Sequence, residues 1–231
     1  MREIVLDTET TGLDPASGDR IVDIGCVELE NHMPTGRIYQ QYINPEKSQS
    51  AEVIAVHGLT DEFLADKPTF KEIADDFLKF IGDDSILVIH NAPFDMKFLN
   101  AELEWCNRPC IPMDRALDTL VMARQKFPGS RVNLNDLCKR FGIDNSARTV
   151  HGALLDSQLL AEVYLEMLGG KEPGLVLKTS QPIEKKEKKA ELNNVSHETL
   201  APRNFPLSEE ERLAHENFVK TIKSNLWGIA T

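Results

Sequence analysis

The feature of this sequence that most constrains its fold is the order of its predicted strands and helices. Three β-rich segments come first, at residues 3–8, 20–30 and 37–44, and they predict an antiparallel meander. From residue 60 onward, helical patterns accompany one compact apolar strand at residues 85–90. Strands followed by alternating helices are typical of an α/β fold in which a mixed β-sheet is flanked by helices.

The helices are predicted from apolar spacing and from residues that favour helix ends. Apolar residues recur at helical intervals in residues 69–81 and 153–168. Thr60 is expected to cap a short helix, and Pro93 is expected in the first turn of a helix that opens at Asn91. Further helices are predicted within residues 113–124 and at residues 133–141.

The composition changes after Gly169 and Gly170, and this change divides the chain. Residues 1–170 are predicted to form one α/β domain, and residues 171–206 a flexible linker. Within that linker, residues 178–191 are polar and charged and almost free of large apolar side chains.

A helical pattern resumes at residues 208–225, where Ser208 and Glu211 are spaced as a capping box. A short amphipathic segment on a linker cannot bury its own apolar face. Residues 207–231 are therefore predicted to be a helical segment that docks onto a partner protein. The alternative is a tail that packs back on its own domain.

The net charge of −11 limits how this chain can engage nucleic acid. Tight DNA binding depends on Lys and Arg side chains that neutralise phosphates, and this chain has 26 of them against 37 acidic residues. If the chain acts on nucleic acid, we expect another protein to deliver the substrate, or bound metal ions to supply the positive charge.

The lack of recognisable targeting signals and the small number of cysteines predict a cytoplasmic protein. No apolar run approaches the ~20 residues of a membrane helix, and the N-terminus lacks a signal-peptide pattern. We expect a cytoplasmic protein with no membrane partner, whose four cysteines stay reduced. Cys106 and Cys110 are spaced like half of a zinc site, but no second Cys/His pair follows nearby, so core or loop thiols are expected.

Asp7 and Glu9 stand two residues apart at the end of the first predicted strand. On a strand, residues i and i+2 point to the same face, so the two carboxylates should lie side by side. Close carboxylates repel unless a cation joins them, and Mg²⁺ or Mn²⁺ prefers such oxygen ligands. The pair indicates a metal site; the alternative is a solvated strand end.

Asp95 is a third carboxylate, in the first turn of the helix that opens at Asn91. Phe94, Phe98 and Leu99 can face the core, which leaves Asp95 near the rim of the sheet. The alternative is an ordinary acid at a helix start, where the macrodipole favours negative charge.

His151 and Asp156 form the last group. Five residues span about 140° of helical rotation, so the two would not share a helical face. We therefore expect His151 in the loop before the helix and Asp156 on the helix itself. A loop histidine beside metal-bound carboxylates suits general-base chemistry near neutral pH; the alternative is an exposed loop histidine. Together, the four carboxylates and His151 describe a two-metal hydrolytic site.

Three segments of the chain carry a family resemblance: Asp7–Gly12 (DTETTG), His90–Asp95 (HNAPFD) and His151–Asp156 (HGALLD). They resemble, in order, the three motifs of the DEDDh family of 3′→5′ exonucleases, and the resemblance runs over residues 1–170. It implies an RNase H-like fold with a central mixed sheet.

The resemblance also implies roles for the acidic residues and the histidine. Asp7, Glu9, Asp95 and Asp156 would hold two Mg²⁺ or Mn²⁺ ions, and His151 would deprotonate the attacking water. One ion would activate that water, and the other would stabilise the leaving 3′ oxygen.

Four further positions match substrate contacts of the family: Thr10, Glu52, His57 and Phe94. Phe94 would stack on a terminal base, which is a sequence-tolerant contact; the alternative is a core phenylalanine. His57 has the alternative of a buried structural histidine.

The segments outside the three motifs narrow the resemblance to proofreading subunits of bacterial replicative polymerases. The similarity covers residues 151–165 and the tail ending at Leu226 and Trp227. It implies binding to a single-stranded or frayed 3′ end of DNA and to an alpha-type polymerase catalytic subunit through the tail. A small theta-like subunit and the sliding clamp are further candidate partners. Residues 172–177 (EPGLVL) occupy the usual place of a clamp-binding peptide, but they lack a leading Gln and a terminal aromatic.

Three functions compete at this stage. The first is a 3′→5′ exonuclease that removes mismatched 3′-terminal nucleotides by two-metal-ion phosphodiester hydrolysis within a replicative polymerase. The second is a free-standing RNA-trimming exonuclease, similar to RNase T or oligoribonuclease, which would not need the linker and tail. The third is a non-catalytic scaffold between polymerase and clamp, which would not need mutually repelling carboxylates.

Overall fold

A computed structural model describes residues 1–148, 150–170 and 208–221 of the chain. The chain divides into two compact units, residues 1–177 and 178–231. The predicted linker at 171–206, the clamp segment at 172–177 and the end of the tail at 222–231 lie outside the described residues.

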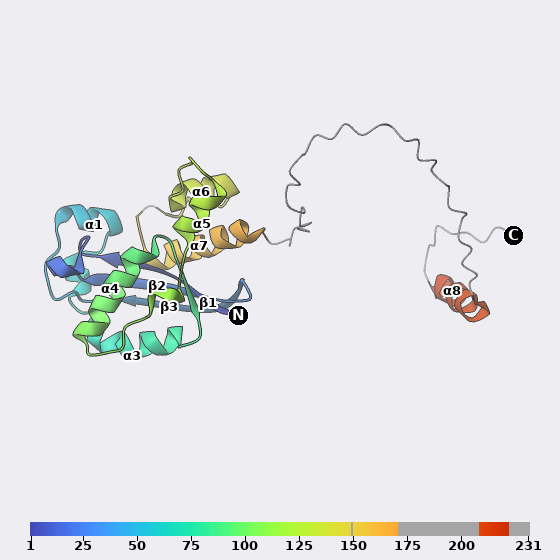
Figure 1. Cartoon of the computed structure of the whole chain (residues 1–231), viewed down its shortest axis with the longest axis horizontal. Helices are drawn as coiled ribbons and strands as arrows, with labels where there is room; N and C mark the ends of the chain where they lie inside the picture. The colour runs from blue at the N-terminus through green and yellow to red at the C-terminus, as the bar shows by residue number, and fades with distance from the viewer. Residues whose placement is uncertain (149, 171–207, 222–231) are drawn as a thin grey trace, which may run out of the picture. The chain divides into compact units, whose positions relative to one another are not determined.

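Five strands of the first unit form one mixed sheet in the order β3-β2-β1-β4-β5 (Figure 1). The antiparallel pairing of β1 with β2 and of β2 with β3 confirms the predicted meander, and β4 and β5 continue the sheet parallel to β1. The strands are β1 (Arg2–Thr10), β2 (Ile21–Glu30), β3 (Met33–Tyr42), β4 (Ile86–Ile89) and β5 (Ala116–Asp118).

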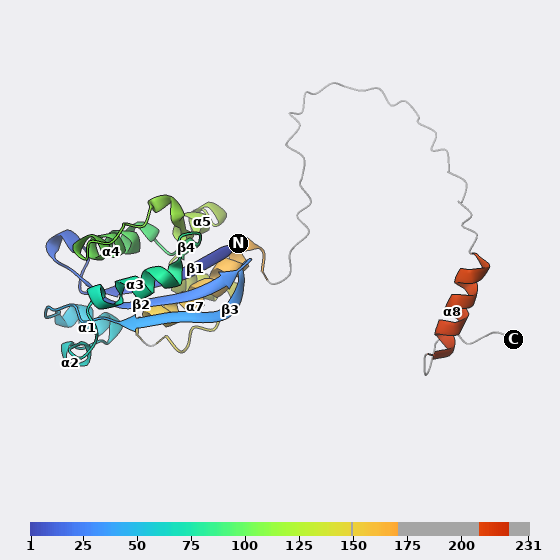
Figure 2. The same cartoon turned by 90° about the horizontal axis from the view of Figure 1, so that it is seen from below.

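Helices cover both faces of this sheet, which confirms the predicted fold class (Figure 2). The α-helices of the first unit are α1 (Ala51–His57), α2 (Asp61–Leu64), α3 (Phe70–Ile81), α4 (Ala92–Trp105), α5 (Thr119–Lys126), α6 (Leu134–Phe141) and α7 (Ala153–Leu168). Two 3₁₀ turns occupy Pro15–Ser17 and Met113–Arg115.

β1 lies between two apolar cores and is therefore buried on both faces. Ile4 and Leu6 point into a core shared with α3 and α4, whereas Val5 points into a core shared with α6 and α7. All three side chains are fully buried. The strand is therefore held firmly on both sides up to the point where its acidic residues begin.

Most helix predictions are confirmed, and the differences have local causes. The helix predicted within residues 113–124 is α5, which begins only at Thr119 because a 3₁₀ turn and β5 come first. At its start, the Asp118 side chain accepts hydrogen bonds from the N–H groups of Leu120 and Val121. α1 was not expected, because β-branched residues such as Val53 weaken its helical signal.

α8 (Glu209–Thr221) belongs to the second unit, and its start confirms the predicted capping box. The backbone N–H and Oγ of Ser208 donate to Glu211 Oε2 at 2.9 and 2.8 Å, and the Glu211 N–H donates back to Ser208 Oγ at 3.2 Å. Among the described residues, no helix combines the length and apolar character needed to span a membrane.

Close packing at Gly25 fixes the start of α7 against β2. A Cβ at Gly25 would lie 2.2 Å from the backbone carbon of Ala153, so only glycine fits. Ser157 Oγ donates to the Gly25 carbonyl at 2.9 Å, and the Ala153 N–H donates to Asp23 Oδ2 at 3.2 Å. The first turn of α7, which carries Asp156, is thereby locked to the central sheet.

Gly25→Ala is expected to destabilise the domain by about 1–3 kcal/mol, the range for overpacking a tight contact. The added methyl group would force α7 away from β2. Calorimetric melting of the two variants measures the effect. Gly152→Ala is the matched control, because a Cβ there meets nothing within 4 Å. An equal loss of stability in both variants would contradict the role of this contact.

Candidate active site

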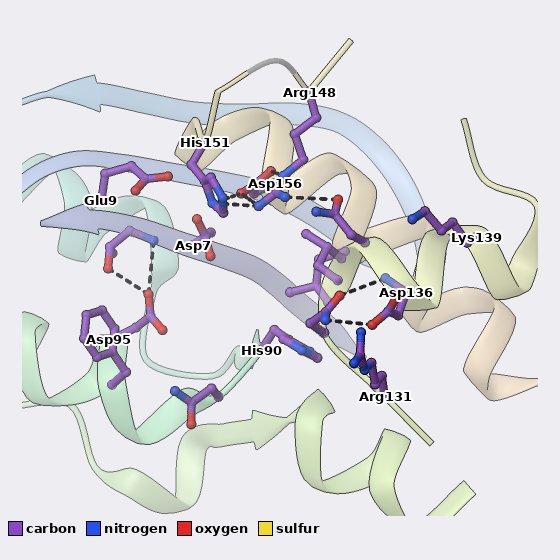
Figure 3. A pocket seen from close by; sticks show the side chains of 17 residues that line it. Asp7, Glu9, His90, Asp95, Arg131, Asp136, Lys139, Arg148, His151 and Asp156 are labelled. Carbon is purple, nitrogen blue, oxygen red and sulfur yellow. Dashed lines mark hydrogen bonds and ion pairs between the residues drawn. The ribbon is translucent and has the colours of Figure 1, made fainter. Parts of the chain in front are cut away.

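A cavity of about 570 Å³ opens beside the C-terminal half of β1. Figure 3 shows that its walls come from β1, the start of α4, the α6 region and the loop that leads into α7. The five residues predicted to carry the chemistry all line it: Asp7, Glu9, Asp95, His151 and Asp156.

Asp7 and Glu9 share one face of β1, as their spacing predicts. Asp7 is half-buried, and Glu9 is 8% exposed. Burial, followed by the carboxylates of Asp95 and Glu9, raises the pKa of Asp7 well above its usual value. Burial and then Asp156 raise the pKa of Glu9 to about 8. These two carboxyl groups hold negative charge only at a cost in free energy.

Asp95 is held in the first turn of α4 by the backbone of the facing strand. Its Oδ1 accepts hydrogen bonds from the Thr8 N–H at 3.1 Å and from Thr8 Oγ1 at 2.7 Å. Burial raises the pKa of Asp95 to about 7, although the Thr8 hydrogen bonds oppose the shift. Asn91 caps α4 in the left-handed conformation that Asn tolerates, and this turn aims Asp95 at β1.

His151 lies in the loop before α7 and Asp156 in the first turn of α7, as expected. The His151 N–H donates to the Val56 carbonyl of α1 at 3.1 Å, which ties the loop to that helix. The side chain of His151 is 48% exposed, and its Nδ1 lies 3.5 Å from Asp156 Oδ2. Burial and the Arg148 guanidinium lower the pKa of His151, so the imidazole is neutral near pH 7.

The tightest group in the cavity joins Glu9, His151 and Asp156, whose ligand atoms all lie within 4.8 Å of one another. Asp7 and Asp95 line the same cavity outside this group. Carboxylate oxygens with one imidazole are donors that Mg²⁺ or Mn²⁺ accepts, and burial, the largest cause of the raised carboxyl pKa values, makes a nearby cation favourable for the ionised carboxylates. The donor set therefore fits divalent metal.

Arg148 is a site residue that the sequence reasoning missed. Its Nε and Nη2 donate to Asp156 Oδ1 and Oδ2 at 2.5 and 2.6 Å, and Nη2 also contacts His151 Nδ1 at 2.7 Å. The only sequence signal was an arginine three residues before the motif histidine.

The second residue that the sequence did not reveal is Asp23, a buried carboxylate. It faces Glu9 across the β1–β2 register, and burial raises its pKa to about 7. Its Oδ1 accepts no hydrogen bond among the described residues. Asp23 stood among apolar strand residues, and only the register brings it to the site.

A second cavity of about 230 Å³ adjoins the first, and Thr8, Glu9 and Phe94 line both. Thr10 and His57, two of the four predicted substrate contacts, also line it. Glu52 does not: it is exposed in the first turn of α1 and lines neither cavity.

His57 and Phe94 have structural features of both alternatives that the sequence left open. His57 is 3% exposed, and its Nδ1 accepts the Leu59 N–H at 3.0 Å, so its proton is on Nε2. That buried Nε2 has no hydrogen-bond partner among the described residues. Phe94 packs against Phe98 with ring centroids 5.0 Å apart, yet it also faces both cavities.

The mixed sheet and the acidic cavity, which is also lined by His90 and His151, match a metal-dependent nuclease. A family model described as "Exonuclease" matches residues 4–164. The chain is 48% identical over 225 residues to the DNA polymerase III subunit epsilon of Rickettsia conorii, covering 96% of each chain. It is 42% identical over 223 residues to the same subunit of Escherichia coli, covering 93% of this chain and 90% of that protein.

The fold is shared with solved nuclease structures. The nuclease domain of 3′hExo, a DEDDh family member bound to rAMP, superposes with a TM-score of 0.61 at 22% identity, covering 72% of this chain and 91% of that one. The chain belongs to the exonuclease family and, within it, to the DNA polymerase III epsilon subunits. Its activity is that of a metal-dependent 3′→5′ proofreading exonuclease, the first of the three functions weighed from the sequence.

Without metal, the free energy of unfolding is expected to fall as the pH rises from about 6.5 to 8. Glu9 and Asp95, with pKa values of about 8 and about 7, keep their protons longer in the folded chain than in the unfolded chain. The stability they contribute at low pH is therefore lost as the pH rises through these values. The histidines His57, His90 and His151 have lowered pKa values and act oppositely, but only below about pH 6.5.

Urea unfolding in EDTA at several pH values measures this slope. The expected loss is roughly 2–3 kcal/mol across the range, and it should be smaller in Glu9→Gln. Saturating Mg²⁺ should remove most of it, since bound cations hold the carboxylates ionised. Stability that is independent of pH in both proteins would contradict the arrangement.

Proposed function

We propose that Asp7, Glu9, Asp95 and Asp156 hold two Mg²⁺ or Mn²⁺ ions and that His151 acts as the general base. The observation that carries the proposal is the convergence of these five side chains on one cavity, where burial raises the carboxyl pKa values of Asp7, Glu9 and Asp95. When bound, divalent cations would supply Lewis-acid activation of the water and charge stabilisation at the scissile phosphate.

The chain's own residues position the reactants. Thr8 fixes one oxygen of Asp95 through two hydrogen bonds. Asp23 and Ser157 hold the start of α7 on the sheet, which fixes the position of Asp156. His151 is neutral near pH 7 and partly exposed, so it is suited to take a proton from water at the cavity mouth.

The smaller cavity is proposed to receive the 3′-terminal nucleoside. Phe94 would stack against the base, and Val53 and Val56 would add apolar contact. The unpaired Nε2–H of His57 would donate to an oxygen of the terminal nucleotide, which would offset the cost of its burial. Thr10 would contact the sugar, and Glu52 could act only from the exposed rim.

Basic residues at the rim of the active-site cavity are proposed to guide the rest of the DNA strand. Arg131 and Lys139 are exposed and line the active-site cavity, and Arg140 joins them in an adjoining depression. On a chain with a net charge of −11, such a small basic rim would attract a few phosphates and hold the strand weakly.

The partners are proposed from the family and the tail. Residues 207–231 would dock onto an alpha-type polymerase catalytic subunit, and residues 172–177 would contact the sliding clamp. A small theta-like subunit would complete the assembly. This assembly would work in the cytoplasmic bacterial replisome, where the polymerase holds the duplex and presents a frayed 3′ end.

Asp7→Ala should abolish nuclease activity, and His151→Gln should lower kcat roughly 10²–10⁴-fold, the range for loss of a general base. Digestion of paired and 3′-mismatched primers with Mg²⁺, with and without the polymerase subunit, measures both. Asp76→Asn is the matched control, since Asp76 is exposed on α3 away from the cavity. Retained activity in Asp7→Ala would exclude its role as a ligand.

Truncations separate the proposed partner contacts. Residues 1–170 alone should keep nuclease activity but bind neither the polymerase subunit nor the clamp, because both docking segments are gone. Residues 1–206 should regain the clamp contact only. Size-exclusion chromatography with each partner measures assembly. Polymerase binding by residues 1–170 would refute the role of the tail, and equal clamp binding by both truncations would refute the role of residues 172–177.

A further inference from the structure

Arg148 contacts both the proposed metal ligand and the proposed general base. Its guanidinium makes a bidentate pair with Asp156, and Nη2 also lies 2.7 Å from His151 Nδ1 (Figure 3). The two charged side chains are almost completely buried, with 8% of Arg148 and 4% of Asp156 exposed. The pair is therefore a buried ion pair in the cavity wall and not a surface ion pair. Removing either partner of a buried pair leaves the other charge uncompensated, which costs much more free energy than at the surface.

For Asp156, the contact occupies both carboxylate oxygens with a cation. A fork-shaped guanidinium matches a carboxylate in a single plane, and charge-assisted bonds of this kind are among the strongest hydrogen bonds in proteins. A metal ion that binds Asp156 needs at least one of these oxygens. Arg148 and the divalent cation therefore compete for the same negative charge.

For His151, the contact fixes which nitrogen carries the proton. An arginine can only donate, so Nδ1 of His151 must accept, and a neutral imidazole then has its proton on Nε2. In this state the one lone pair of the ring is covered by Arg148. The imidazole cannot accept a proton from water until this contact opens.

Arg148 has a separate anchor that does not depend on Asp156. Its Nη1 donates to Asn135 Oδ1 at 3.0 Å, and Asn145 Nδ2 donates to the same oxygen at 2.9 Å. The guanidinium would thus keep a partner at the cavity wall after it releases the carboxylate. Release would cost less than stripping a buried arginine of every hydrogen bond.

We propose that Arg148 is a positioning residue that competes with the divalent cation for Asp156 and, while it does so, keeps His151 from acting as a base. The inference rests on the proposed metal site. It makes metal binding and base activation one event, because the same side chain must leave both groups. A chain that is not loaded with metal would then have no competent base.

Calorimetric titration of the full chain with Mn²⁺ tests the competition directly. Arg148→Gln should bind Mn²⁺ roughly 10- to 100-fold more tightly, since a buried competitor is gone. Arg131→Gln is the matched control: it removes an arginine that lines the same cavity and is exposed. Its affinity should change about twofold or less, the effect expected of an exposed charge. Unchanged or weaker binding by Arg148→Gln would overturn the proposal, as would an equal gain in Arg131→Gln.

Arg148→Lys keeps the positive charge but loses the fork-shaped guanidinium. Its affinity for Mn²⁺ is expected to lie between those of the wild type and Arg148→Gln. If Arg148→Gln does not fold, Arg148→Lys tests the competition in its place. Nitrogen-15 NMR gives a readout independent of activity. His151, assigned by its absence in His151→Gln, should show an unprotonated Nδ1 in metal-free protein. Saturating Mg²⁺ should shift that nitrogen. An Nδ1 that is protonated without metal, or that is unaffected by Mg²⁺, would refute the coupling.

The same titrations separate this inference from the proposed metal site. If the wild type binds no Mn²⁺, or if Asp7→Asn binds it as well as the wild type, the metal site itself is wrong and the inference falls with it. If Asp7→Asn weakens binding while Arg148→Gln matches the wild type, the metal site stands and only the role of Arg148 is refuted.

Discussion

Electrostatic repulsion among buried carboxylates is the constraint on which the rest of this site depends. Asp7, Glu9, Asp95 and Asp156 share one cavity. Burial raises the carboxyl pKa values of the first three, and repulsion from the neighbouring carboxylates adds to the shifts of Asp7 and Glu9. Such a cluster persists only because the surrounding fold is stable enough to hold it. Cations offset such repulsion, so a cluster of this geometry is suited to bind divalent metal.

The fold meets this constraint by fixing the four carboxylates to three rigid elements, β1, α4 and α7. β1 is buried on both faces and carries Asp7 and Glu9, Thr8 holds Asp95 through two hydrogen bonds, and Gly25 locks the first turn of α7. His151, by contrast, lies on a loop and is half-exposed. The proposed metal ligands are therefore held rigidly, and the proposed base, His151, is held through a few breakable contacts. This division suits a site in which the metal ligands must hold position while the base is released on demand.

The sequence predicted the elements with a strong local signal, and it failed where tertiary contacts decide. Two-residue spacing on a strand was enough to place Asp7 beside Glu9, and capping chemistry placed the start of α8. β5 is only three residues long and has no readable period. The pairing of Arg148 with Asp156 depends on the path of the loop between them, and the approach of Asp23 to Glu9 depends on strand register. No periodicity encodes either contact.

The distribution of charge explains how a nuclease can have so acidic a chain. A strong basic surface would hold any DNA and would compete with a polymerase for correctly paired ends. Here the cations that face the cavity are few: Arg148 pairs with Asp156, and Arg131 and Lys139 remain at the rim. We expect such a site to bind a strand weakly unless another protein supplies it, and to gain most of its positive charge only with metal. Weak intrinsic binding would favour selectivity, because a paired 3′ end that must first fray would be released before it is cut.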